Sequence, residues 1–140
     1  MRYGSHITVA LFLALAFMKA GVAWSYARFI ILGMLTLSID YIGKTMFKLW
    51  SLPVFHNLFT PSLLTAFIYY TCGKQPATFY AIGWILHILL DLLKKKPKGV
   101  KLFFPFSNII FNLNIAEDYS KLDNLLLSLF IILTIFLLLI

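Results

Sequence analysis

A histidine and an aspartate lie four residues apart inside a strongly apolar stretch. His87 and Asp91 belong to the run 81–93, which is otherwise almost free of polar side chains. A spacing of four residues places both side chains on one face of a helix. Ionisable groups in such segments are costly to bury and are therefore candidates for function. An imidazole and a carboxylate in this arrangement can bind one metal ion or form a buried hydrogen-bonded pair, and both interpretations stay open.

The composition of the chain predicts an integral membrane protein. Of its 140 residues, 61% are hydrophobic and 12% are charged, whereas soluble domains contain about 45–50% apolar and about 25% charged residues. We expect an all-α fold, with residues 1–140 forming one small polytopic transmembrane bundle of four to five helices. Cys72 is the only cysteine, so an intramolecular disulfide and a thiolate metal cluster are excluded.

Five apolar segments are the expected helices. Thr60 and Pro61 suit a helix start, because proline fits the first helical turn. Several segments are shorter than the roughly 20 residues that are needed to cross a bilayer. A Phe-rich segment near 100–114, containing Phe103, Phe104 and Phe106, is expected to be irregular and to lie at the membrane interface. The predicted helices cover about 5–18, 22–39, 58–73, 77–93 and 123–140.

The distribution of positive charge predicts the orientation. With the N-terminus in the cytoplasm, nine of the 12 lysines and arginines fall on the cytoplasmic side, as the positive-inside rule requires. A net charge of +7 in such a protein indicates contact with anionic lipid of the cell membrane, inner or plasma, and not with nucleic acid. A homo-oligomer is compatible with the sequence. The lysines expected to contact lipid head groups are Lys94, Lys95, Lys96, Lys98 and Lys101.

In this topology all three histidines and two carboxylates fall at the same membrane face. They are His6, Asp40, His56, His87 and Asp91. Imidazole and carboxylate suit a divalent ion, with Zn²⁺ first and Mn²⁺ or Fe²⁺ as alternatives. Such an ion activates water for hydrolysis, with Asp91 or Asp40 as general base and Thr60 and Ser62 supporting the ligands. The predicted function is a membrane-embedded metal-dependent hydrolase that acts on a lipid phosphate or an ester at the cytoplasmic face.

The same residues allow a second interpretation, in which the protein is not an enzyme. His6 could be a polar anchor near the interface and Asp40 could cap a helix. The polar cluster could also be a structural core, stabilised by a metal ion or by hydrogen bonds. The basic face would then bind lipid or a partner. A transporter or channel is less consistent with the sequence, because the charges gather at one face and no inverted repeat is present.

Several short blocks resemble those of a known family. Residues 5–11 (SHITVAL) resemble T-H-x-x-x-G, residues 37–40 (LSID) resemble L-P-D-x-D, and residues 56–63 (HNLFTPSL) resemble H-R-G-x-T-H-S-L. Residues 83–91 (GWILHILLD) resemble G-x-x-x-H-x-x-x-D, and residues 99–105 (GVKLFFP) resemble the following G-x-x-L-x-x-P. These blocks resemble the YdjM-like family of membrane-bound metal-dependent hydrolases, described as LexA-binding and inner-membrane-associated.

The resemblance implies a ligand set and also a loss from it. It assigns metal binding to His6, Asp40, His56, His87 and Asp91. Ser38 stands where the family has the first aspartate of its D-x-D pair, Pro61 where it has a second histidine, and Asn57 where it has arginine. The resemblance therefore implies one metal ion where relatives could hold more, or a degenerate member that has kept the fold without the activity.

Overall fold

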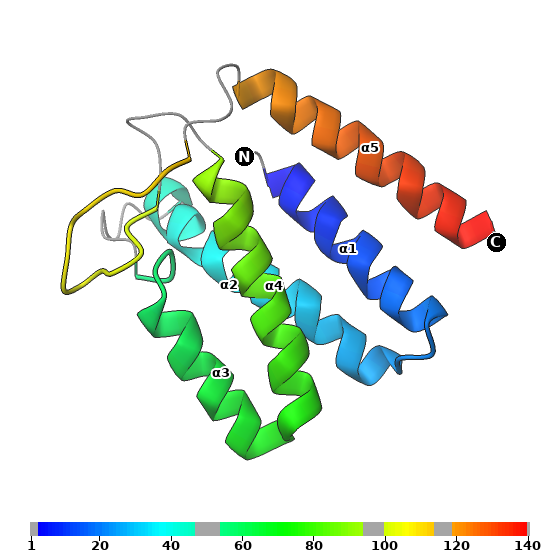
Figure 1. Cartoon of the computed structure of the whole chain (residues 1–140), viewed down its shortest axis with the longest axis horizontal. Coiled ribbons are helices and arrows are strands. Elements are labelled where there is room, and N and C mark those ends of the chain that lie inside the picture. Colours follow the sequence, from blue (N-terminus) through cyan, green and yellow to red (C-terminus); the bar gives the residue numbers. More distant parts are fainter. Residues whose placement is uncertain (1–2, 47–53, 94–99, 114–118, 140) are drawn as a thin grey trace.

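The computed structural model describes residues 3–46, 54–93, 100–113 and 119–139. Within these ranges the chain forms five α-helices and no strand, apart from one isolated bridge between Val100 and Phe111. The all-helical prediction is therefore confirmed, and the described residues form five helices, within the predicted four to five. In chain order (Figure 1), the helices are α1 (Tyr3–Lys19), α2 (Trp24–Met46), α3 (Phe59–Cys72), α4 (Lys74–Leu92) and α5 (Tyr119–Leu139).

The helix boundaries differ from the predicted ones by three or more residues in three places. Helix α2 continues to Met46, beyond the predicted end at residue 39, and α4 begins at Lys74 instead of residue 77. Helix α5 begins at Tyr119 instead of residue 123. Gly73 alone separates α3 from α4, with a φ of 92° that favours glycine. Among the described residues, no helix combines the length and the apolar character that crossing a membrane would require. The transmembrane placement of the bundle stays a prediction.

Helices α2 and α4 pack closely because each contributes a glycine that lies against the backbone of the other. A Cβ atom on Gly33 would overlap the carbonyl oxygen of Tyr80, and one on Gly83 would overlap the carbonyl oxygen of Ile30. Helix α3 packs against α4, while α1 lies between α2 and α5. The core on the α3 side contains Leu37, Ile68, Ala77, Tyr80, Trp84 and Ile88.

Four helix ends meet at one end of the bundle. The starts of α1 and α5 and the ends of α2 and α4 lie together near the label N in Figure 1. The topology inferred from charge also places these ends on one side. The polar residues near these ends are therefore brought close to one another by the up-and-down arrangement of the helices.

The predicted irregular segment is present as the loop 100–113, drawn in yellow in Figure 1. Its backbone is hydrogen-bonded to the residue before α3 and to the last residue of α4. The amide of Leu58 donates to the carbonyl of Leu102 at 2.9 Å, and the amide of Leu113 donates to the carbonyl of Leu92 at 2.6 Å. Val100 is almost fully buried. The loop is thereby fixed to the start of α3 and to the end of α4.

Candidate metal centre

Three of the predicted ligands form one buried group. His87 and Asp91 come from α4 and His6 from α1, and each is only 2–3% exposed. One potential ligand atom of each residue lies within 4.8 Å of those of the other two, so this group could hold a metal ion. The close packing of α1 and α4 onto α2 thus brings together side chains that are about 80 residues apart in sequence.

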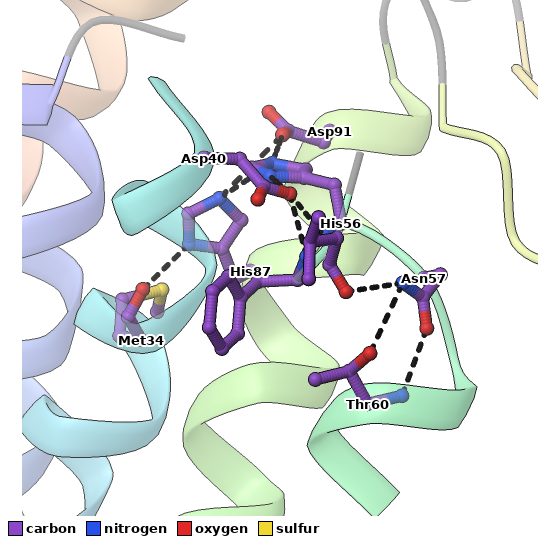
Figure 2. Close-up of polar contacts among 9 residues, drawn as sticks. Met34, Asp40, His56, Asn57, Thr60, His87 and Asp91 are labelled. Carbon is purple, nitrogen blue, oxygen red and sulfur yellow. Dashed lines mark hydrogen bonds and ion pairs between the residues drawn. The ribbon is translucent and has the colours of Figure 1, made fainter. Parts of the chain in front are cut away.

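The ring of His87 is oriented by the backbone of α2. Its Nδ1 lies 2.7 Å from the carbonyl oxygen of Met34, as Figure 2 shows. A carbonyl only accepts hydrogen bonds, so Nδ1 carries the hydrogen and Nε2 is left with a lone pair. Burial lowers the pKa of His87 from 6.5 to about 4, against the opposing effect of the Asp91 carboxylate, which favours the protonated ring. His87 is therefore neutral near pH 7, with Nε2 available as a ligand.

His6 completes the group from α1. Its ring stacks on that of His87, with the centroids 4.0 Å apart and an angle of 9° between the planes. Its Nε2 lies 3.5 Å from Oδ1 of Asp91 and makes no hydrogen bond within the described part of the chain. The neighbouring Ser5 donates to the buried Asp123 of α5, which ties the start of α1 to α5.

His56 closes the other side of Asp91. Its Nε2 is 2.9 Å from Oδ2 of Asp91 and 3.2 Å from Nε2 of His87 (Figure 2). Because a carboxylate only accepts, the hydrogen on Nε2 of His56 points toward Asp91 in this arrangement. His56 can become a fourth ligand through Nε2 only by giving up that hydrogen. Its side chain is 22% exposed, which makes it the most accessible member of the cluster.

Asp40 holds the segment that carries His56. Its Oδ2 accepts hydrogen bonds from the amides of Phe55 at 2.6 Å and His56 at 2.8 Å. The same oxygen is 3.8 Å from Nδ1 of His56. Its Oδ1 is buried and has no hydrogen bond among the described residues. The geometry makes Asp40 a positioning residue for His56, and its predicted roles as ligand and general base stay predictions.

Thr60 and Ser62 act in the first turn of α3. The amide of Thr60 donates to Oδ1 of Asn57 at 2.9 Å, while the hydroxyl of Ser62 donates to the carbonyl of Leu58. Asn57 also donates to the carbonyl of Val54 at 2.6 Å, which closes the turn beside His56. The predicted support for the site is therefore indirect, since these bonds define the start of α3 next to the His56 segment.

Three contributors to the site were not predicted from the sequence. Asn57 is a residue type that commonly caps helices, and its position just before the Thr60-Pro61 start was the signal that could have identified it. Asp123 was assigned only as the beginning of an apolar helix. The carbonyl of Met34 has no signal in the sequence, because any residue would provide one.

The predicted lipid-binding lysines are described only in part. Lys101 donates from Nζ to Oδ1 of Asn108 at 3.1 Å, at the base of the loop 100–113. The other four, Lys94, Lys95, Lys96 and Lys98, lie outside the described residues. Contact of this group with lipid head groups stays a prediction.

The comparisons with known proteins leave the chain without an assigned family. No family model, no curated protein and no solved structure matches it. The similarity to YdjM-like hydrolases is therefore a resemblance of short motifs. A function has to be argued from the geometry of His6, His56, His87 and Asp91.

Proposed function

We propose that this protein binds a divalent metal ion through His6, His87 and Asp91 and acts as a metal-dependent hydrolase at a membrane. One observation carries the proposal: three ligand-type side chains from two helices converge in a site that is almost closed to solvent. Buried polar and charged groups are costly unless they are paired or coordinate a metal. A bound cation would compensate the carboxylate and use the lone pairs of both imidazoles.

The distances suit a small divalent ion. Ligands about 2.0–2.1 Å from a tetrahedral Zn²⁺ ion are about 3.3 Å from one another. Nε2 of His6 lies 3.5 Å from Oδ1 of Asp91, and Nε2 of His87 lies 3.5 Å from Oδ2 of the same carboxylate. Metal-binding histidines generally donate their second ring N–H to a carbonyl or a carboxylate. His87 already does so toward Met34, so only small movements are needed. Zn²⁺ is the first choice, with Mn²⁺ or Fe²⁺ as alternatives.

In this proposal the other polar groups of the site transfer a proton or hold His56 in position. A divalent ion bound here would activate water and stabilise negative charge on the substrate. Asp91 holds the position of His56 through the bond at 2.9 Å. His56, the most accessible of the four groups, would exchange a proton with the substrate. Asp40 keeps the His56 backbone in place. With His56 as the general base, Asp91 is better placed than Asp40 to assist it.

The outer surface supports a membrane as the working environment. Monomeric soluble proteins rarely expose large continuous apolar patches. Helix α5 packs on α1 and exposes apolar side chains along most of its length. Contact with lipid would cover this surface, and we place the protein in the cell membrane with its N-terminus in the cytoplasm. A lipid phosphate or ester is the substrate class that fits. The exposed residues of α5 are Leu125, Leu129, Ile131, Ile132, Ile135, Phe136, Leu138 and Leu139.

Metal content is the first test. Inductively coupled plasma mass spectrometry should find about one ion of Zn, Mn or Fe per purified chain, as expected for a single site. The ion should be lost in His87→Ala/Asp91→Ala and retained in Thr78→Ala, an exposed position on the same helix. A metal-dependent esterase or phosphatase activity, abolished by a chelator, would then identify the reaction. Absence of metal in all three proteins after reconstitution with each ion would refute the proposal.

A structural polar core is the second candidate. It is favoured by the hydrogen bonds that the cluster already makes, from His87 to Met34 and from His56 to Asp91. Ser38 and Pro61, at the positions where the resembled family has two further ligands, also favour it. In that case His87→Ala/Asp91→Ala would lower the stability of the protein, while added metal would leave the stability of the wild type unchanged.

A further inference from the structure

The loop 100–113 presents an apolar surface to its surroundings. Phe106 is 80% exposed and Ile109 is 64% exposed, although large apolar side chains are commonly buried. Phe59, at the start of α3, lies edge-on to Phe106 with their centroids 5.7 Å apart, so the surface continues onto the helix. We name this surface the loop patch, and its members are Phe59, Phe103, Phe106, Ile109, Ile110 and Leu113.

The loop patch is held outward by local backbone structure. The amides of Phe106 and Ser107 donate to the carbonyl of Phe103 at 2.9 Å and 3.0 Å. Val100 and Phe111 exchange two backbone hydrogen bonds across the base of the loop, at 3.0 Å and 2.9 Å. These bonds leave the Phe103–Phe106 turn at the tip. The apolar side chains are thus displayed on an ordered turn.

The base of the loop is attached to the segments that carry two members of the candidate metal centre. Leu102 bonds to Leu58, which is two residues from His56, and Leu113 bonds to Leu92, which follows Asp91 directly. Whatever the loop patch contacts will therefore lie at a fixed place relative to the metal centre. His56, the accessible member of that centre, lies on the side where the loop is attached.

The lysines that neighbour the loop in the sequence indicate its partner. Lys101 lies at the base of the loop. In the sequence, residues 92–116 contain five lysines and no aspartate or glutamate, and the four lysines other than Lys101 lie outside the described residues. Exposed aromatic and aliphatic side chains beside basic residues suit the head-group region of an anionic bilayer. We propose that the loop patch inserts into the surface of an anionic phospholipid membrane and thereby places lipid head groups beside the metal centre. This inference rests on the proposed work at a membrane, but not on the identity of the metal.

Two labelled proteins test the insertion. The fluorophore NBD would be attached at Phe106→Cys in a Cys72→Ser background, and separately at native Cys72, an exposed residue at the end of α3. Both proteins would be added to vesicles of equal parts phosphatidylcholine and phosphatidylglycerol. Flotation would report membrane binding, and quenching by iodide in the buffer would report the exposure of each probe to water. On vesicles, we expect the probe at 106 to be protected from iodide and the probe at 72 to be protected less.

Two unlabelled variants measure the contribution of each part. Phe106→Asp should weaken binding to the anionic vesicles by about tenfold or more, because one largely exposed aromatic side chain no longer enters the bilayer. Lys101→Glu should weaken binding to anionic vesicles more than to vesicles of phosphatidylcholine alone. Metal content should stay unchanged in both variants, since the side chain of Lys101 bonds to Asn108 and the ring of Phe106 packs on Phe59, away from the ligands.

The outcomes separate this inference from the proposed function. Failure of the wild type to float would contradict the membrane part of the proposed function and the inference together. Flotation with the probe at 106 as accessible to iodide as the probe at 72 would overturn the inference alone. Protection of the probe at 106 without vesicles, increasing with protein concentration, would assign the loop patch to a second copy of the chain and also overturn it.

Discussion

The close contact of α2 and α4 predicts that replacing glycine by alanine there will lower the stability of the protein instead of raising it. Replacing glycine by alanine in the interior of a helix ordinarily stabilises the helix by about 1 kcal/mol, because glycine is the poorer helix former. A Cβ atom on residue 83 would instead overlap the carbonyl oxygen of Ile30. We therefore expect Gly83→Ala to destabilise the protein, against the intrinsic preference. We expect Gly33→Ala to destabilise the protein for the same reason, since its Cβ atom would overlap the carbonyl oxygen of Tyr80.

The magnitude follows from the distances at the contact. The helices must separate by about 1 Å to restore ordinary van der Waals contact. Such a movement lengthens the bond from His87 to Met34 from 2.7 Å beyond the limit of a hydrogen bond. Overpacking costs about 1–3 kcal/mol, and a buried donor left unsatisfied costs about 1–3 kcal/mol. After subtraction of the helix-propensity gain, we expect a loss of about 3 kcal/mol in the free energy of unfolding.

Chemical denaturation of wild type and variants measures this loss. Thr78→Ala, an exposed change on α4, is the matched control and should shift the unfolding free energy by less than about 0.5 kcal/mol. Metal titration of Gly83→Ala should also show an affinity about 10–100-fold lower, because His87 loses the carbonyl that orients its ring. If Gly83→Ala raised stability by about 1 kcal/mol with unchanged metal affinity, the contact of α2 and α4 would not require glycine at this position.

Three further predictions concern individual members of the cluster. His6→Phe keeps the ring stacking on His87 and removes one ligand, so metal content should fall while far-ultraviolet circular dichroism is unchanged; full metal retention would exclude His6 as a ligand. Asp40→Asn weakens two backbone hydrogen bonds to a charged acceptor and should lower the unfolding free energy by about 1.5–3 kcal/mol, with metal retained by the other ligands. In metal-free protein, stability should fall as the pH decreases from 6.5 toward 4, because the unfolded state protonates His87 first. The same decline in His87→Gln would assign it to other groups.

Much of the architecture could be predicted from local pattern. Long apolar segments separated by polar or Gly-Pro-containing stretches indicated five helices, and five are present in the described residues. Predicted helix ends were less accurate where they were drawn only from the end of an apolar segment. Helix α2 extends through a polar end containing Asp40 and Lys44, because hydrogen bonding along the helix does not require apolar side chains. Whether the helices cross a membrane is a property that apolar composition suggested and the described helices do not establish.

The sequence by itself determined which side chains were available for chemistry and at which end of the bundle they would lie. Charge distribution and alternating helix direction placed all three histidines with Asp40 and Asp91. The i, i+4 spacing placed His87 and Asp91 on one face, and Nε2 of His87 is 3.5 Å from Oδ2 of Asp91. It left open whether the two residues pair with each other or bind a third group.

Only the tertiary structure decided how these groups are connected. His87 donates to Met34 on α2, while Asp91 accepts from His56 in the segment before α3. The first contact depends on the depth to which two glycines allow α2 and α4 to approach. The second depends on the path of an irregular segment held by Asp40 and Asn57. Both are distances of a few ångströms between residues far apart in sequence, and residue spacing along one helix carries no information about them.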